Sequence, residues 1–248
     1  MSRPGRFPSK PARVSINCFT CQNRDRSEWC NLDPSDVKVL NERKLCLAYA
    51  PGQMLYEQGE ACEGIFVIEQ GTVAVRKADK FGNTVLLRLC HAGETVGYRD
   101  FLAGGSHTTS ADALVNSTVC RIGRGEVRAL LDRNPALGLR FVQRMAQDLE
   151  TAEDAILQTS ALPVRMRLAH LLLMLKDRYG TMGDDGVLKL ELPLARQDIA
   201  AILGARPETI ARTLHALEND GVARFSGRTV IIPDLDLLLD EVERLPGP

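Results

Sequence analysis

The strongest hydrophobic periodicity in the chain lies between Pro135 and Ser160. Apolar residues recur there every seven positions, with a second small or apolar residue three positions later, and the set is Val142, Met145, Leu149, Ala152 and Ile156. This spacing is typical of the seam of a two-stranded coiled coil. The other faces are polar and include Arg144 and Asp148, which we expect to face water. The pattern predicts a dimerisation helix, although the same stripe could pack on the chain's own domain.

The chain before this helix changes to short β-branched and aromatic runs separated by glycines. The runs are Met54–Tyr56, Gly64–Ile68, Thr72–Lys77, Val85–Cys90, Thr95–Val96 and Thr118–Ile122. Strands at this spacing with glycine turns are typical of a small antiparallel barrel or jelly roll. A helix is expected from Pro34 to Arg43, with Asp33 or Ser35 as its cap. Residues 1–17 are basic and rich in proline and serine, which predicts disorder.

The chain after the long helix reads as a winged helix-turn-helix. A helix is expected from Arg165 to Tyr179 and an edge strand from Val187 to Leu192. Two short helices, Arg196–Leu203 and Pro207–Asn219, flank a turn that contains glycine, and a hairpin pattern follows them. We therefore expect an α+β chain with a disordered N-terminus at 1–17, a cysteine-bearing loop plus β-roll sensor domain at 18–134, a dimerisation helix at 135–160 and a DNA-binding domain at 161–248.

The composition narrows the classes of function. A net charge of −1 gives no overall attraction to nucleic acid, so any DNA contact must use a local cluster of basic residues. No apolar run reaches the roughly 18 residues of a membrane span, and the N-terminus lacks the apolar core of a secretory signal. We expect a cytoplasmic protein, in which seven cysteines favour metal, redox or buried thiols over a disulfide scaffold. A metal or redox enzyme is a remote alternative, because no catalytic set accompanies the thiols.

The second short helix carries residue types that read DNA bases. Glu208 and Arg212 lie four positions apart, and Ala211 shares their face. In a major groove, glutamate can accept from cytosine and arginine can reach guanine. Pro207 suits the first helical turn, and contacts to phosphate are expected from Arg196, Gln197, Thr209, Thr213 and Arg228. The alternative is a surface ion pair between Glu208 and Arg212.

These features together resemble a known family. The segment from Leu194 to Ala200, followed by Gly204 to Arg212, resembles the CRP/FNR superfamily of bacterial transcription regulators, and the likeness extends from about residue 18 to 235. The resemblance implies a homodimer on an inverted repeat, with Glu208 and Arg212 reading bases. FNR-type readers usually carry serine at the place of Ala211, while a TGA-like core is still expected. Family activators touch RNA polymerase, and the loops at 78–84 and 180–186 are candidates for that contact.

The sensor region does not resemble a cyclic-nucleotide pocket. The cyclic-AMP receptor protein has a Gly-Glu-Leu stretch and an Arg-Ser pair that holds the phosphate. Here the corresponding region runs from Val96 to Leu102 and then from His107 to Ala111. Arg99 is the nearby cation, and it lies at a different place from that pair. Cyclic nucleotide is therefore not an expected ligand.

The cysteines resemble those of the FNR-type branch. Cys18 and Cys21 form a C-x-x-C, Cys30 follows after a longer gap, and Cys120 ends the β-roll. The resemblance implies that these four hold an oxygen-labile [4Fe-4S] cluster, although the family's third cysteine usually lies closer. Zinc on the same thiols, or a metal-free thiol-disulfide switch near Arg24 and Arg26, are the alternatives. The other thiols, expected in the core or at the surface, are Cys46, Cys62 and Cys90, of which Cys62 and Cys90 are reserve ligands.

The seam differs from the family at one position. FNR-type proteins carry an acidic residue there, and the counterpart in this chain is Ala152. Without buried like charges, we expect the dimer to persist without a cofactor. The sensor would then alter the orientation of the DNA-binding domains more than the association of the subunits.

Overall fold

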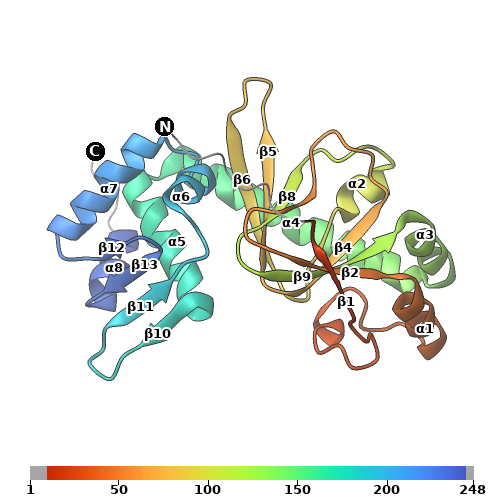
Figure 1. Ribbon diagram of the computed structural model, residues 1–248. Coiled ribbons are helices and arrows are strands. Elements are labelled where there is room, and N and C mark those ends of the chain that lie inside the picture. The colour runs from red at the N-terminus through yellow and green to blue at the C-terminus, as the bar shows by residue number, and fades with distance from the viewer. Residues whose placement is uncertain (1–9, 244–248) are drawn as a thin grey trace. The chain divides into compact units, whose positions relative to one another are not determined.

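The computed structural model describes residues 10–243 (Figure 1). The chain divides into two compact units, Met1–Leu149 and Glu150–Pro248. Within residues 10–243, no helix combines the length and the apolar character that crossing a membrane requires.

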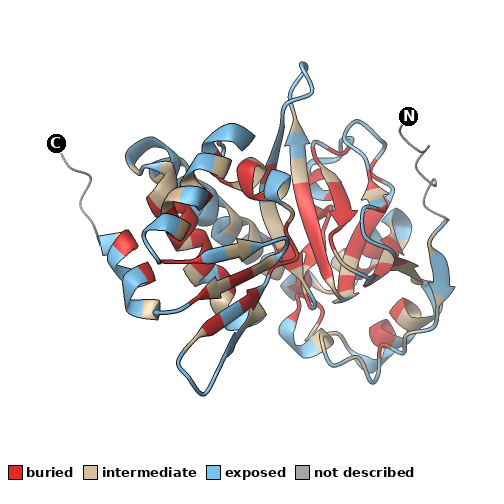
Figure 2. Ribbon diagram, turned by 60° about the vertical axis from the view of Figure 1, so that its left-hand side comes forward, coloured by how far each residue is buried: buried red, intermediate tan, exposed pale blue. Residues whose placement is uncertain are grey.

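Two antiparallel sheets form the β-roll of the N-terminal unit. The first has the strand order β1-β2-β9-β4-β7 and the second the order β3-β8-β5-β6. Their inward side chains form a core around Tyr56, Phe66 and Ile68, which Figure 2 shows as red segments along the strands. The strands are β1 (Ala12–Val14), β2 (Leu45–Tyr49), β3 (Met54–Tyr56), β4 (Gly64–Gln70), β5 (Thr72–Ala78), β6 (Thr84–His91), β7 (Thr95–Val96), β8 (Ser110–Ala113) and β9 (Ser117–Gly123).

A second core joins the cysteine-bearing loop to the helices of this unit. The helices are a 3-10 turn at Arg24–Arg26, α1 (Pro34–Arg43), α2 (Tyr98–Ala103), α3 (Arg124–Arg133) and α4 (Pro135–Ala161). Phe141 of α4 packs edge-on against Trp29 of the loop, with ring centroids 5.7 Å apart, and stacks on Tyr98 of α2 at 5.4 Å. The indole Nε1 of Trp29 donates to Thr95 Oγ1 at 3.1 Å. One aromatic cluster therefore holds the loop, α2 and α4 together.

The N-terminal segment differs from the expectation of disorder over residues 1–17. Ala12–Val14 form β1, which pairs with β2 in the register Ala12↔Ala48. An unpaired sheet edge offers backbone donors and acceptors to any extended segment nearby, and this segment takes them. Residues 1–9 lie outside the described part of the chain.

The C-terminal unit confirms the predicted winged helix-turn-helix, and with the roll and the long helix it confirms the predicted fold class. Leu168 and Leu172 of α5 are fully buried with Leu217 of α7. The sheet has the order β10-β11-β13-β12. The elements are α5 (Val164–Tyr179), β10 (Gly180–Met182), β11 (Leu188–Glu191), α6 (Arg196–Ile202), α7 (Pro207–Asn219), β12 (Arg224–Ser226), β13 (Thr229–Ile232) and a further helix, α8 (Leu235–Glu243).

Arg165 fastens α8 and the end of α7 onto α5. Its guanidinium forms a two-bond pair with Glu241, Nε to Oε2 at 2.5 Å and Nη2 to Oε1 at 2.7 Å. A third nitrogen, Nη1, lies 2.6 Å from Asp220 Oδ2. The Glu241 side chain is only 2% exposed, so it depends on this arginine to offset its charge.

Replacing Arg165 with alanine should lower the free energy of unfolding of the C-terminal unit by about 3 kcal/mol, because the buried Glu241 carboxylate loses its two-bond pair with the guanidinium. Lys176→Ala is the control, since Lys176 pairs with an exposed aspartate and should cost less than about 1 kcal/mol. Urea unfolding followed by circular dichroism measures the change. Trp29 is the only tryptophan of the chain, so its fluorescence should keep the wild-type midpoint; a matching shift of both signals would contradict this assignment.

Candidate functional site

Helices α6 and α7 and the turn between them form a rigid pair. Ile199 of α6 and Ile210 of α7 are buried, and Gly204 adopts φ +58° in the turn, a conformation that a side chain would strain. Arg167 of α5 donates from Nη1 to the carbonyl of Leu203 at 2.5 Å, at the end of α6. This contact satisfies a helix-end carbonyl that would otherwise lack a partner.

The residues predicted to contact DNA lie on the surface of this pair. Glu208 and Arg212 are exposed one turn apart on α7, and Ala211 between them is half-buried. Arg228 is exposed in the turn between β12 and β13. Four further predicted residues are exposed as well: Arg196, Gln197, Pro207 and Thr209. This face of α7 offers hydrogen-bond donors and an acceptor, and an α-helix has dimensions that fit a major groove.

The hairpin that carries Arg228 is tied to α7. Glu218 Oε1 accepts a hydrogen bond from the backbone N–H of Phe225 at 3.0 Å. The other carboxylate oxygen of Glu218 lies 3.3 Å from Nδ1 of His215, on the exposed side of α7. The His215 side chain is 75% exposed, so this contact lies at the surface of α7.

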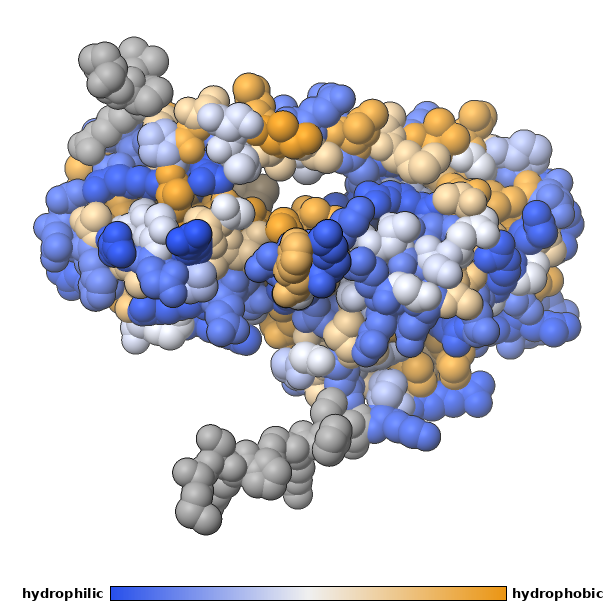
Figure 3. All heavy atoms as spheres, turned by 90° about the horizontal axis from the view of Figure 1, so that it is seen from above, coloured by the Kyte–Doolittle hydropathy of each residue, from blue (hydrophilic) through white to orange (hydrophobic). Residues whose placement is uncertain are grey.

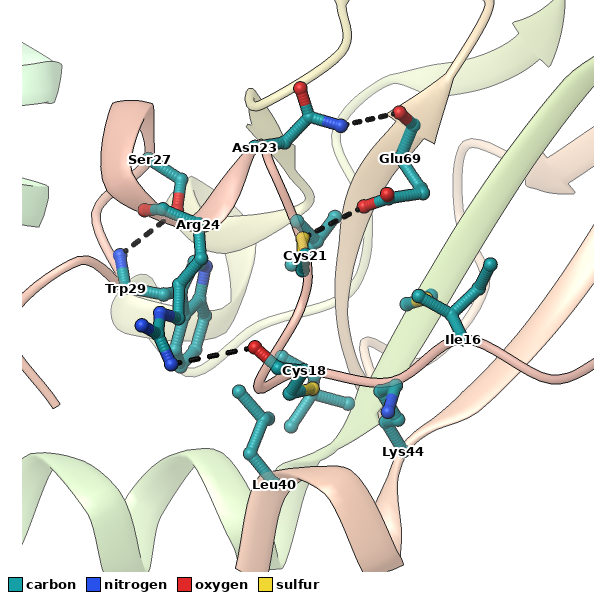
Figure 4. Close-up of a pocket in the computed structure, with 13 residues that line it drawn as sticks. Ile16, Cys18, Cys21, Asn23, Arg24, Ser27, Trp29, Leu40, Lys44 and Glu69 are labelled. Atoms are coloured by element: carbon teal, nitrogen blue, oxygen red, sulfur yellow. Dashed lines mark hydrogen bonds between the residues drawn. The ribbon is translucent and has the colours of Figure 1, made fainter. Parts of the chain in front are cut away.

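One cavity of about 40 Å³ is lined by three of the four predicted cluster ligands: Cys18, Cys21 and Cys120. Figure 4 shows Cys18 and Cys21 there with Arg24, Lys44 and Glu69 around them. The thiol of Cys21 donates to Glu69 Oε2 at 3.0 Å. Burial, followed by this bond to a carboxylate, raises the pKa of Cys21 to about 11. Cysteines far apart in the sequence therefore meet at one cavity beside two cations.

Two of the predicted ligands, Cys30 and Cys120, are arranged differently from the expectation. Cys30 does not line the cavity, and Cys120 forms a disulfide with Cys46. Cys46 is buried in the core, as expected, but it is not a free thiol, because β2 pairs directly with β9 and sets it opposite Cys120. Within residues 10–243, no group of three or more histidine, cysteine or acidic side chains is arranged to hold a metal ion. In this conformation the thiols do not fit a four-thiolate cluster or a zinc ion.

The reserve ligands Cys62 and Cys90 are buried core thiols that do not line the cavity. Cys62 Sγ lies 3.4 Å from the carbonyl oxygen of Gly64. Cys90 is fully enclosed, and burial raises its pKa to about 11 even though Arg88 donates to its sulfur at 3.2 Å. Both positions suit a neutral thiol in a core.

A charged network, which sequence reasoning missed, fastens α4 to the roll. Asp148 accepts from the hydroxyl of Tyr98 and pairs with Arg88, and Arg144 Nε lies 3.2 Å from the same carboxylate. Arg144 also pairs with Glu94. Asp148 is only 12% exposed, so the expectation that it faces water is wrong. The single signal available beforehand was the Arg144 and Asp148 spacing of four along a helix.

The region that corresponds to a nucleotide pocket holds its own polar pair. The buried Asp100 accepts from Thr108 Oγ1 at 2.7 Å and lies 3.3 Å from Nδ1 of His107. Tyr56 stacks on the imidazole with centroids 3.9 Å apart, while Arg99 is exposed. This region therefore contains a buried carboxylate with polar partners of its own, and a carboxylate would repel a phosphate.

An apolar stripe remains exposed along α4. Its large members, between 55% and 66% exposed, are Leu139, Val142, Leu149, Ile156 and Leu157. Figure 3 shows a row of orange apolar side chains along its upper edge, the side on which α4 lies behind the sheets of Figure 1. Ala152 is exposed, whereas Met145 is half-buried and packs against the core around Phe141. Apolar side chains in such a row are typical of an interface with a partner.

Comparisons with known proteins agree with this architecture. A model of the cyclic nucleotide-binding domain matches residues 46–134, and a model of the Crp-like helix-turn-helix domain matches residues 166–241. The transcriptional activatory protein AadR of Rhodopseudomonas palustris is 27% identical over 91% of this chain and 90% of its own length. The anaerobic regulatory protein of Pasteurella multocida is 27% identical over 89% of this chain and 81% of its own length.

A solved structure shows the same fold. FixK2 from Bradyrhizobium japonicum superposes with a TM-score of 0.69 at 23% identity, covering 82% of this chain and 99% of that one. The two domain models lie in the order that the sequence predicted, with α4 between the matched segments. The chain belongs to the CRP/FNR family and is a DNA-binding transcription regulator rather than an enzyme.

Proposed function

We propose that the chain acts in the cytoplasm as a homodimer that binds an inverted repeat with a TGA-like core. The observation that carries this proposal is the exposed face of α7, on which Glu208 and Arg212 lie one turn apart. Glu208 would accept from a cytosine and Arg212 would donate to a guanine. Arg196, Gln197, Thr209 and Arg228 surround them and would hold phosphates, with Pro207 and Ala211 shaping the reading face.

Replacing Arg212 with alanine should weaken binding to a duplex that carries the TGA-core repeat by about 1–3 kcal/mol per half-site. The control is Arg178→Ala, which removes an exposed arginine from α5 of the same unit. Fluorescence anisotropy at one fixed salt concentration measures both variants, because phosphate contacts make affinity depend on salt. Equal losses in the two variants would assign Arg212 a general charge effect in place of base reading.

The exposed stripe of α4 is the surface that we propose for the second copy. Val142, Leu149 and Ile156 repeat along it, Ala152 adds no buried charge to the seam, and Met145 lies at the border between the stripe and the core. A dimer joins two weak half-site contacts into one strong one by raising the effective concentration of the second reader.

Light scattering coupled to gel filtration should find the reduced, metal-free chain dimeric at micromolar concentration. Leu149→Glu should give monomers, since it places a carboxylate in the apolar seam. Gln143→Glu adds the same side chain at another exposed position of α4 and should remain dimeric. Monomeric wild-type protein would show that association needs a further signal.

We propose that Cys18, Cys21, Cys30 and Cys120 sense oxygen or redox state, as [4Fe-4S] ligands once the Cys46–Cys120 disulfide is reduced. Three of them line one cavity, and one similar protein is named an anaerobic regulatory protein. Such a cluster, when bound, offers iron and sulfide that dioxygen attacks. Arg24 and Lys44 lie at the same cavity and would offset the charge of thiolates. The observed disulfide favours a metal-free thiol switch as the second candidate, and zinc is the third.

Anaerobic reconstitution of the reduced full-length chain with iron and sulfide should produce a broad visible absorbance that air removes. Serine at Cys18, Cys21, Cys30 or Cys120 should each abolish the band, because each removes one thiolate. Cys62→Ser is the control and should keep it. Metal analysis decides among the candidates: bound zinc without iron supports a zinc site, and no metal supports the thiol switch.

Two exposed loops remain as proposed contacts for RNA polymerase. Phe81 is exposed near the tip of the β5–β6 hairpin, and residues 181–186, at the end of β10 and in the turn that follows it, are exposed as well. Cyclic nucleotide has no place in this proposal, because Asp100 and His107 pair in the corresponding pocket.

A further inference from the structure

Cys46 and Cys120 face each other across the central strands of the roll. Strands β2 and β9 pair in an antiparallel register that sets Cys46 opposite Cys120, and their Cα atoms are 3.9 Å apart. The two side chains are 4% and 6% exposed. Cys120 also lines the cavity that contains Cys18 and Cys21. Cys120 is therefore bonded to Cys46 across the sheet and at the same time lines the cavity of Cys18 and Cys21.

The sheet keeps the first pair together in either redox state. Strand β9 is hydrogen-bonded to β2 on one side and to β4 on the other, and the register with β2 continues from Leu45 to Tyr49. Reduction of the disulfide leaves this ladder in place, so the two thiols stay adjacent and can join again as an intramolecular reaction. Cys18 and Cys21, by contrast, come from a segment outside the strands and helices.

We propose that Cys46 and Cys120 form a reversible disulfide switch, in which oxidation binds the sulfur of Cys120 to Cys46 and reduction frees it to act as a thiolate at the cavity of Cys18 and Cys21. The ligand role of Cys120 rests on the proposed function, whereas the disulfide itself does not. In this scheme Cys46 is not a ligand at all. Its bond to Cys120 determines whether the Cys120 sulfur is available as the fourth ligand.

The chemistry balances with a hydroperoxide as the oxidant. One thiol of the pair takes an oxygen atom from the hydroperoxide, which leaves as an alcohol, and becomes a sulfenic acid. The second thiol attacks that sulfur, the S–S bond forms and water leaves. A small external dithiol reverses the step by exchange and is itself oxidised to a disulfide.

The other free thiols of the described chain are poorer partners. Cys62 and Cys90 are enclosed in the roll and do not line the cavity. The thiol of Cys21 is already hydrogen-bonded to Glu69. Cys46 alone of the seven cysteines stands directly opposite Cys120 in a strand register.

The test uses the full-length, metal-free chain. The protein is reduced, freed of reductant, treated with cumene hydroperoxide and blocked with iodoacetamide, and its peptides are mapped by mass spectrometry. We expect the cross-linked Cys46–Cys120 peptide as the main disulfide, lost on exposure to dithiothreitol. Cys90→Ser should keep the cross-link and Cys46→Ala should abolish it. Fully alkylated Cys120 after peroxide, or Cys120 joined to Cys18 or Cys21, would overturn the proposal.

Iron uptake separates this inference from the cluster proposal. Oxidised wild-type protein that carries the mapped cross-link should take up at least tenfold less iron than reduced protein, and reduced Cys46→Ala should match reduced wild type. Unchanged Trp29 fluorescence confirms that this variant is folded. Equal uptake by the oxidised and reduced forms contradicts the switch. If Cys120→Ser binds iron normally while wild-type protein forms the cross-link, the ligand assignment fails and the disulfide remains without that role.

Discussion

The pairing of β2 with β9 is the constraint on which the sensor end of the molecule depends. Strand β9 lies between β2 and β4, and this register sets Cys120 opposite Cys46 on one side and opposite Val67 on the other. A shift of one residue would send every side chain of β9 to the other face of the sheet. The cavity, the disulfide and the buried core would all be lost together, so the apolar burial that stabilises the roll also fixes the chemistry of its thiols.

The aromatic cluster gives that chemistry a physical connection to α4. Trp29 follows the C-x-x-C segment and packs on Phe141, while the network around Asp148 holds the same helix to β6 and α2. Protein interiors are close-packed and deform poorly. A rearrangement of the cysteine-bearing loop that moved the indole would therefore displace Phe141 as well. The exposed stripe of α4 begins on the opposite side of this buried contact.

The roll combines a shared scaffold with side-chain contacts of its own. Its sheets match a cyclic nucleotide-binding domain model, yet Asp100, His107 and Tyr56 fill the corresponding region with their own contacts. Function is decided by such side chains and not by the scaffold. In the C-terminal unit, too, particular side chains matter more than a global property. The net charge of the whole chain is −1, yet one face of α7 has an exposed arginine and an exposed glutamate.

The sequence by itself determined the elements with strong local periodicity: the long helix, the two helices of the reading motif and most strands of the roll. It also indicated the family, because the α6–α7 motif is short and contiguous. Tertiary structure alone decided that Asp148 is turned away from water at 12% exposure, that Ala12–Val14 add a strand, and that Cys46 pairs with Cys120 across 74 residues. Those features depend on which distant segments meet, and the period of a single strand or helix carries no information about its neighbour.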